Sequence, residues 1–116
     1  MENTKVKISK VLKELGVSPS LNGFGYLREA IALVLTDDSL LNRVITKQLY
    51  PNIAKKFNTT PSRVERGMRH AIERGFDKGN SELMEQIFGY TVSSCSGRAT
   101  NKEFIACVVD YFQCQE

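Results

Sequence analysis

The stretch YPNIAKKFNTTPSRVERGMRHAIER, residues 50–74, contains two helical patterns joined by a short turn, and it decides the fold of the chain. Asn58 tolerates a left-handed backbone better than other non-glycine residues, so it can end the first helix. Thr60 is a favoured N-cap for the second helix, and Pro61 suits its first helical position. These three signals agree on one boundary and predict a helix-turn-helix over about residues 50–78.

Two further residues fit the packing of such a unit. Ala54 is small enough to let two helices approach, and Val64 can pack beneath the first helix. In the first helix, Lys55 and Lys56 should point away from the core. The residues expected on its buried side are Ile53, Ala54 and Phe57.

The second helix has two different faces. When successive residues are placed about 100° apart, the side expected in the core collects Val64, Met68, Ala71, Ile72 and Gly75. The opposite side, with Glu65 at its edge, collects Ser62, Arg63, Arg66, Arg69, His70, Glu73 and Arg74. Such a face can be an ordinary solvated surface with arginine–glutamate pairs, but the turn chemistry favours a binding role.

The positive charge of the chain is local. Residues 47–78 hold eight Lys and Arg against Glu65, Glu73 and Asp77, a net of +5. The remaining 84 residues carry eight basic and ten acidic groups, a net of −2. A surface that meets phosphates gathers cations in this way, because each Lys or Arg contact releases condensed counterions. The distribution predicts nucleic acid as the partner.

Length and composition limit the other possibilities. With 116 residues, 41% of them hydrophobic, the chain is expected to form one domain with its own core. Cys95, Cys107 and Cys114 are odd in number and lack a CxxC pair, so neither a disulfide framework nor a zinc site is expected. No apolar run suggests a membrane span and no N-terminal signal is present, so we expect a cytoplasmic protein without a membrane partner.

No enzyme motif accompanies the basic helix. Ser94 and Cys95 are the available nucleophile candidates, but the only histidine, His70, lies on the basic helix. No paired-carboxylate, glycine-rich or metal-ligand pattern is present. We therefore expect no catalytic residues, no metal site and no cofactor.

Helical spacing continues on both sides of the helix-turn-helix. The other expected helices cover about residues 4–15, 27–37, 40–45, 81–88 and 101–112. The turn between the first two is expected to contain Ser18, Pro19, Asn22, Gly23 and Gly25. Gly16 and Gly89 should end helices, residues 90–99 should form a loop, and Thr100 with Glu103 makes a capping box. No alternating run predicts a strand, so the fold class is expected to be all-α.

Several stretches together resemble one known family. LYPNIAKKFNTTPSRVERGMRHAIERG, residues 49–75, is similar to the effector domain of stage-zero sporulation protein A, a response-regulator transcription factor of endospore-forming bacteria. The similarity extends to YLREAI at 26–31, FGYTVSS at 88–94 and NKEFIA at 101–106. The resemblance implies a compact six-helix domain that controls the initiation of sporulation. It also implies binding to a double-stranded DNA box similar to TGTCGAA, as an activator at some promoters and a repressor at others.

The resemblance further implies a place in a two-component phosphorelay. In the full-length family, a receiver domain is phosphorylated and dimerises, which relieves inhibition of the effector domain. The receiver is expected to be absent here, so that residues 1–116 form a single effector domain acting at the nucleoid. Tandem boxes could recruit two copies side by side, as a homodimer on DNA.

The first turn of the second helix is expected to read bases, because that part of a recognition helix enters the major groove. Arginine forks onto guanine O6 and N7, and a carboxylate accepts from cytosine N4. Arg63, Arg66 and Glu65 supply these groups, and the resemblance implies the same three positions. Glu65 could instead orient a neighbouring arginine. The residues expected to contact phosphates are Lys55, Thr60, Ser62, Arg69 and His70.

A second contact is implied for the segment after the basic helix. In the family, the region resembling residues 80–92 is implicated in contacting the housekeeping sigma factor of RNA polymerase. In this chain it offers Phe88 and Val92 beside acidic Glu82 and Glu85. Core packing explains these apolar residues equally well.

Two residues depart from the family pattern. Gly67 stands where an alanine is expected, which costs about 1 kcal/mol of helix propensity and either allows close packing or weakens the helix. Pro61 replaces a small residue at a position that tolerates proline. The alternative function is a helix-turn-helix module used for RNA or protein interaction.

Overall fold

Helices account for all the regular structure that can be described. The computed structural model describes residues 2–36, 48–78, 81–89 and 99–114. Its six helices are α1 (Glu2–Glu14), α2 (Asn22–Thr36), α4 (Tyr50–Lys56), α5 (Pro61–Lys78), α6 (Ser81–Phe88) and α7 (Asn101–Gln113). No described residue lies in a strand, so the all-α prediction is confirmed. The helix expected over residues 40–45 lies outside the described residues.

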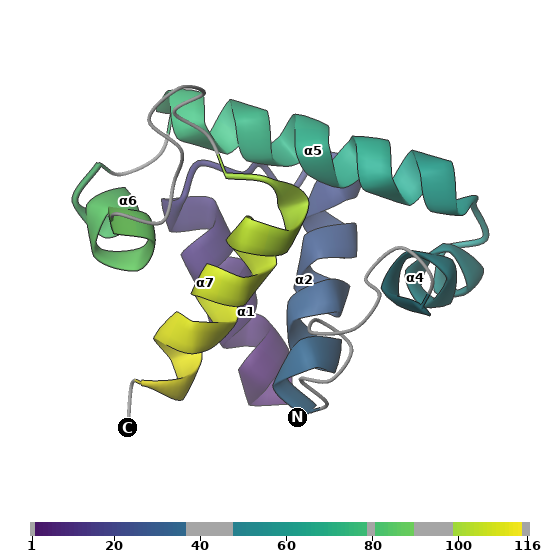
Figure 1. The fold of residues 1–116 in the computed structure, drawn as a ribbon, viewed down its shortest axis with the longest axis horizontal. Coiled ribbons are helices and arrows are strands. Elements are labelled where there is room, and N and C mark those ends of the chain that lie inside the picture. The colour runs from purple at the N-terminus through teal and green to yellow at the C-terminus, as the bar shows by residue number, and fades with distance from the viewer. Residues whose placement is uncertain (1, 37–47, 79–80, 90–98, 115–116) are drawn as a thin grey trace.

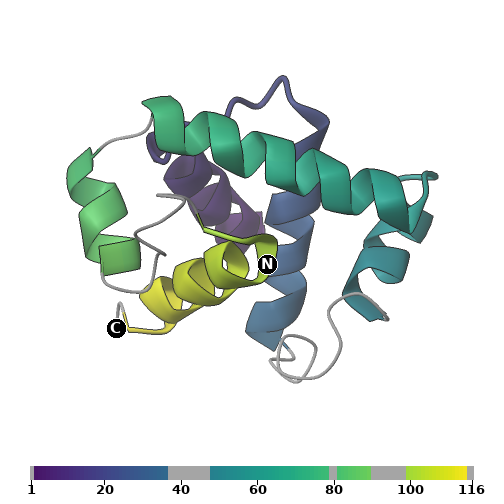
Figure 2. The same cartoon turned by 45° about the horizontal axis from the view of Figure 1, so that its top comes forward.

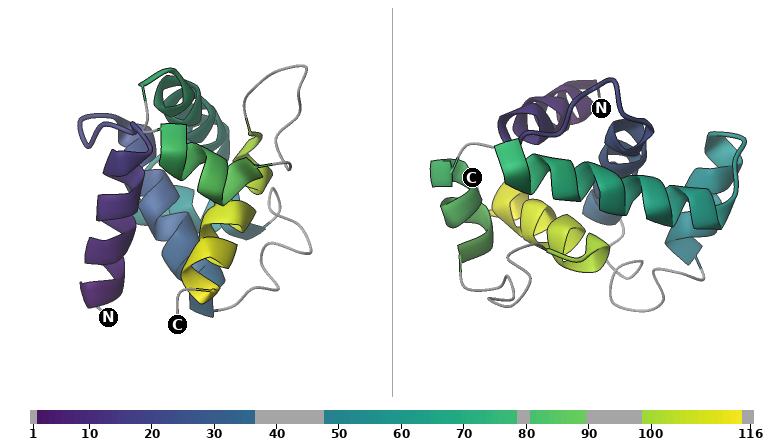
Figure 3. Two further views of the ribbon diagram at one scale, coloured as in Figure 1. Left: turned by 90° about the vertical axis from the view of Figure 1, so that its left-hand side faces the viewer. Right: turned by 90° about the horizontal axis from the view of Figure 1, so that it is seen from above.

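The longest helix, α5, lies across the other helices. Figure 1 shows α5 running over the ends of α1, α2 and α7. The central helix is α2, which packs against α1, α4, α5 and α7. Figures 2 and 3 show α4 at the N-terminal end of α5 and α6 near its C-terminal end. One side of α5 is therefore supported along its length, while no described helix covers the other side.

The core lies beneath α5 and between α1, α2 and α7. Its large, fully buried side chains include Ile8, Leu12, Leu15, Leu27, Ile31, Ile53, Met68, Ile72, Phe104 and Ile105. Burial of a side chain of this size stabilises a fold by about 1.5–3 kcal/mol. The core residues predicted for α5 are all buried, namely Val64, Met68, Ala71, Ile72 and Gly75. The predicted apolar face of that helix is confirmed.

The helix ends follow the local chemistry expected from the sequence. Gly16, after α1, and Gly89, after α6, have positive φ angles of 87° and 42°. The hydroxyl of Thr100 accepts a hydrogen bond from the Glu103 N–H at 3.1 Å, and the Glu103 carboxylate accepts one from the Thr100 N–H at 2.9 Å. The two glycine ends and the capping box are confirmed.

The start of α2 was predicted wrongly. Asn22, Gly23 and Gly25 were expected in a turn, but they lie inside the helix. A Cβ atom at Gly23 would overlap the carbonyl oxygen of Gly67 in α5, and it would lie 2.7 Å from the Cβ of Ala71. Glycine is therefore required at this position because two helices approach closely, and no turn is involved.

Candidate nucleic-acid interface

The α4–α5 unit, residues 50–78, has the turn that the sequence predicts. Asn58 has a φ angle of 56°, which places it in the left-handed region at the end of α4. The Thr60 hydroxyl accepts a hydrogen bond from the N–H of Arg63 at 3.2 Å, and α5 begins at Pro61. An N-cap of this kind stabilises a helix by about 1 kcal/mol. The direction in which α5 leaves the turn is therefore set by local chemistry.

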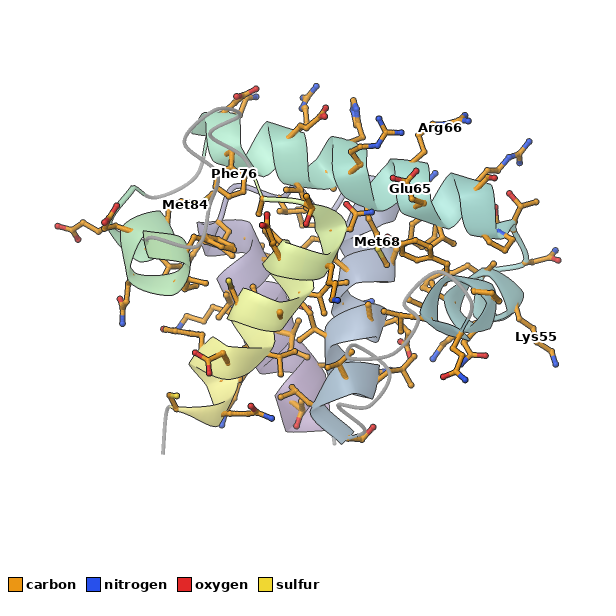
Figure 4. The ribbon with its side chains drawn as sticks, viewed as in Figure 1. Lys55, Glu65, Arg66, Met68, Phe76 and Met84 are labelled. Carbon is orange, nitrogen blue, oxygen red and sulfur yellow. The ribbon has the colours of Figure 1, made fainter. Side chains whose placement is uncertain are left out.

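The two faces of α5 are separated as the sequence predicts. Figure 4 shows Met68 pointing into the molecule and Arg66 pointing away from it. The exposed residues of the helix include Ser62, Arg63, Arg66, Arg69, His70 and Arg74. Glu65 and Glu73 are half-buried at the border between the faces. The structure thus brings the predicted cations of α5 onto one open surface.

Gly67 lies on the side of α5 that faces α2. A Cβ atom at Gly67 would lie 2.9 Å from the ring of Tyr26 and 3.8 Å from the backbone nitrogen of Gly23. Tyr26 is buried, so its ring has little room to withdraw. Of the two interpretations of this glycine, close packing is the one supported: it lets an aromatic ring of α2 lie directly against the backbone of α5.

Glu65 forms an ion pair with Arg69, one turn further along α5. The Nε atom of Arg69 lies 3.2 Å from one carboxylate oxygen of Glu65, and a second guanidinium nitrogen lies 3.5 Å from the other. Both side chains remain substantially exposed, at 54% for Arg69 and 40% for Glu65, so the pair contributes less than about 1 kcal/mol. A phosphate or a base could separate it at small cost.

Arg63 and Arg66 have a different environment from Arg69. Among the described residues, no carboxylate lies within ion-pair distance of either guanidinium group. Arg66 lines a hollow of about 320 Å³ together with Ser62 and Tyr50, beside the first turns of α5. Both arginines are therefore open to an acceptor on another molecule.

The two lysines of α4 also differ. Lys55 is exposed and points into solvent (Figure 4). Lys56 lies 3.1 Å from one carboxylate oxygen of Glu29 in α2, and Lys5 of α1 lies 3.3 Å from the other. Burial raises the pKa of Glu29, but the hydrogen bonds and charges of both lysines outweigh this and hold the pKa below its ordinary value. Lys56 is tied to the body of the molecule, and no such tie holds Lys55 among the described residues.

Phe57 corrects one prediction about the buried side of α4. Ile53 and Ala54 are buried as expected, but Phe57 is 39% exposed. Its ring contacts Tyr26 edge-on, with the ring centroids 5.2 Å apart. The reason is that Phe57 lies at the C-cap of α4, where the chain leaves the helix towards Asn58.

Asn101, at the start of α7, was missed in the sequence. Its side chain donates hydrogen bonds to the hydroxyl of Tyr50 at 3.0 Å and to the backbone carbonyl of Glu65 at 3.1 Å. Burial raises the pKa of Tyr50, and the negative charge of Glu65 raises it further. The hydrogen bond from Asn101 lowers the pKa, but the pKa stays above its ordinary value. No local signal marks Asn101 as buried, because its partners lie 36 and 51 residues away in the chain.

The α6 region corrects the expectation for one of the predicted polymerase contacts. Phe88 is 2% exposed and packs between Phe76 and Phe104, with ring centroids 5.2 and 5.4 Å away. Its side chain is therefore part of the core and is not presented to a partner, as the packing interpretation anticipated. Val92 lies outside the described residues. Phe76 of α5 and Met84 of α6, both labelled in Figure 4, are partly buried and pack against the core.

Other kinds of site find no support in the part of the chain that the structure describes. There, no three His, Cys, Asp or Glu side chains gather as a possible metal site. Cys107 and Cys114 form no disulfide among the described residues. None of the described helices combines the length and apolar character needed to cross a membrane.

The fold and the basic face together define a class of protein. An all-α domain that presents arginines along the open side of a rigid helix is typical of nucleic-acid-binding domains. A family model described as "Sporulation initiation factor Spo0A C terminal" matches residues 8–112. The chain belongs to this family. It is a DNA-binding domain of a sporulation transcription regulator, and this family is not one of enzymes.

Proposed function

We propose that the α4–α5 unit works as a helix-turn-helix and reads double-stranded DNA with the first turns of α5. The observation that carries this proposal is the state of Arg63 and Arg66, which are exposed and lack a carboxylate partner among the described residues. Each could form a bidentate contact with guanine O6 and N7 in the major groove. The buried side of the same helix holds these side chains on a rigid support.

Glu65 is proposed as the third base contact. A carboxylate can accept a hydrogen bond from cytosine N4, and in the free chain this carboxylate holds Arg69 instead. On DNA, Glu65 would exchange Arg69 for a cytosine, which would leave Arg69 to meet a phosphate. The two roles that the sequence left open for Glu65 would then belong to two states of the same side chain.

The phosphate contacts are proposed to surround this reading surface. Lys55, Ser62 and His70 are exposed, and Thr60 lies at the N-terminus of α5. The first amides of a helix and its dipole favour a phosphate at that end. Such contacts would orient the domain on DNA without selecting a sequence.

The finer regulatory role is also a proposal. We infer that the chain recognises a box similar to TGTCGAA in the cytoplasm, activates some sporulation promoters and represses others, and binds tandem boxes as two copies. A sigma-factor contact through the α6 region would have to use exposed side chains, such as Glu85 and Gln86, because Phe88 is buried. The family membership and the acidic character of this surface support that assignment.

Duplex binding of matched arginine variants tests the proposal. Arg66→Ala should weaken binding to a box duplex about tenfold or more and relax specificity at one base pair. Arg74→Ala removes a cation two turns further along the same exposed face, and it should cost only a few-fold at all sequences. Urea unfolding should show both variants within about 0.5 kcal/mol of the wild type.

Two results would contradict the proposal. If single-stranded or duplex RNA bound more tightly than the box duplex, an RNA-binding module would be indicated. If binding to DNA ignored the box sequence and survived Arg66→Ala, base reading by α5 would be refuted. A titration across salt concentrations separates these cases. Phosphate contacts alone make the affinity fall with salt, but they do not distinguish the box duplex from other duplexes.

A further inference from the structure

Three helices meet at one buried amide beneath the first turns of α5. The Asn101 side chain of α7 donates one hydrogen bond to the Tyr50 hydroxyl in α4 and another to the backbone carbonyl of Glu65 in α5. Asn101 is 8% exposed and Tyr50 is 5% exposed. Among the described residues, Asn101 is the only amide or charged side chain that is buried. We call this arrangement the Asn101 junction.

The Asn101 junction lies directly beside the surface proposed to read bases. Glu65, whose carbonyl it holds, stands between Arg63 and Arg66 along α5. Tyr50 lines the hollow of about 320 Å³ that also contains Arg66. Tyr50 and Asn101 together line a second hollow, of about 460 Å³, next to Glu65. The junction is therefore attached to the turn that carries the proposed base contacts.

The first turns of α5 contribute few apolar side chains of their own to the core. Val64 and Met68 supply the buried side chains of its first turns, and Gly67 supplies none. Apolar burial is non-directional, so it favours contact without specifying the angle between polar groups. Hydrogen bonds weaken steeply when their length or angle changes, and a broken one leaves buried polar groups unsatisfied. The two bonds of Asn101 therefore add directional restraints from α4 and α7 to the close packing of α5 on α2.

We propose that Asn101 and Tyr50 are positioning residues for base recognition. They hold the first turns of α5 in the orientation at which Arg63 and Arg66 meet base edges, and they touch no base themselves. The side chains of a binding site must be held within about 0.5 Å of the geometry that binds the ligand. This proposal rests on the proposed function of the two arginines.

The test compares discrimination, not affinity alone. Dissociation constants would be measured for a TGTCGAA-type duplex and for the same duplex with one G·C pair inverted, at several salt concentrations. Asn101→Ala removes both bonds of the junction, and Tyr50→Phe removes one. Val108→Ala is the control, because Val108 is a fully buried residue of α7 that does not form part of the junction. Urea unfolding, measured at the temperature of the binding assay, would show that each variant is folded there.

The positioning role predicts that Asn101→Ala lowers the ratio of the two constants about tenfold and Tyr50→Phe about threefold, with an unchanged salt slope. Val108→Ala should lose stability and keep the ratio. If Asn101→Ala is less stable but keeps the wild-type ratio, the junction is only structural and the proposal fails. If Asn101→Ala does not fold, an unchanged ratio in Tyr50→Phe refutes the proposal equally. A wild-type chain without discrimination would instead refute the proposed function itself.

Discussion

The two faces of α5 differ in what they require of a residue. The buried face uses the small residues Ala71 and Gly75, with half-buried Gly67 beside them, and lies so close to its neighbours that backbone meets backbone. The exposed face carries long cations, of which Arg63 and Arg66 have no ion-pair partner among the described residues. A change on the buried face should therefore appear as lost stability, and a change on the exposed face as lost selectivity. The following predictions test that division and how far it extends.

The largest effect is expected where α2 touches the buried face. Gly23→Ala would place a Cβ atom against the carbonyl oxygen of Gly67, and backbone cannot move aside as a flexible side chain can. We expect a loss of about 3 kcal/mol in the free energy of unfolding, measured by urea denaturation. The matched control is Gly25→Ala in the same helix, whose Cβ would lie 3.4 Å from the Phe57 ring. That variant should keep its stability or gain up to about 1 kcal/mol from helix propensity. Equal stabilities would show that the two helices do not pack as closely as described.

Glu65, at the border of the two faces, should give the next largest effect. Glu65→Gln abolishes the ion pair with Arg69 and removes a negative charge from the side of α5 that is proposed to face DNA. We expect discrimination at one C·G pair of the box to fall about tenfold, while affinity for unrelated duplexes rises because repulsion of phosphates is lost. Stability should change by less than about 0.5 kcal/mol.

The control for this prediction is Glu73→Gln, which removes a carboxylate two turns further along α5. It should raise affinity for unrelated duplexes without changing the preference at any single pair. The pattern across base pairs distinguishes the two roles of Glu65. A loss spread evenly over several pairs would mean that Glu65 only orients Arg69, and the base contact would have to be withdrawn.

The parts of the molecule that the sequence predicted correctly depend on short-range chemistry. Asn58, Thr60 and Pro61 act within the turn itself, and Thr100 and Glu103 act within one capping box. The two faces of α5 follow from helical periodicity, which needs only the residues of that helix. The base and phosphate contacts stay predictions, because they depend on how α5 meets a second molecule.

The errors and omissions have the opposite origin. Gly23 and Gly25 resemble turn residues until α5 is placed against α2, and the need for glycine at position 23 comes from Gly67. In the sequence, Asn101 has the pattern of an ordinary first residue of a helix. Its role depends on Tyr50 and Glu65, which lie far away in the chain and contact it only in the folded structure. Such residues are recognisable only when tertiary contacts are known, and both lie on the supporting side of the interface.

The smallest predicted effect concerns the tie between α4 and the body of the molecule. Glu29 has a folded-state pKa below its ordinary value of 4.5 because Lys56 and Lys5 outweigh the effect of burial. Its stabilising contribution is therefore complete above the ordinary pKa and is lost as the pH falls through the folded-state pKa. Glu29→Gln should cost up to about 1 kcal/mol at pH 7, and its difference from the wild type should disappear in acid.

A double-mutant cycle with Lys56→Gln sharpens this last prediction, since partners in one ion pair should not lose stability additively. At pH 7, the double variant should be little less stable than Glu29→Gln alone, whereas Lys56→Gln alone should cost less because Lys5 still pairs with Glu29. A difference in stability between Glu29→Gln and the wild type that persists at low pH would contradict the pKa shift.

The two lysines of α4 should also differ in DNA binding. Lys56→Gln should leave DNA affinity nearly unchanged, whereas Lys55→Gln should lower the slope of log affinity against log salt by about 1, the value for one phosphate contact. If both lysines weakened DNA binding equally, Lys56 would belong to the exposed, DNA-facing surface and the division between support and recognition would not extend to α4.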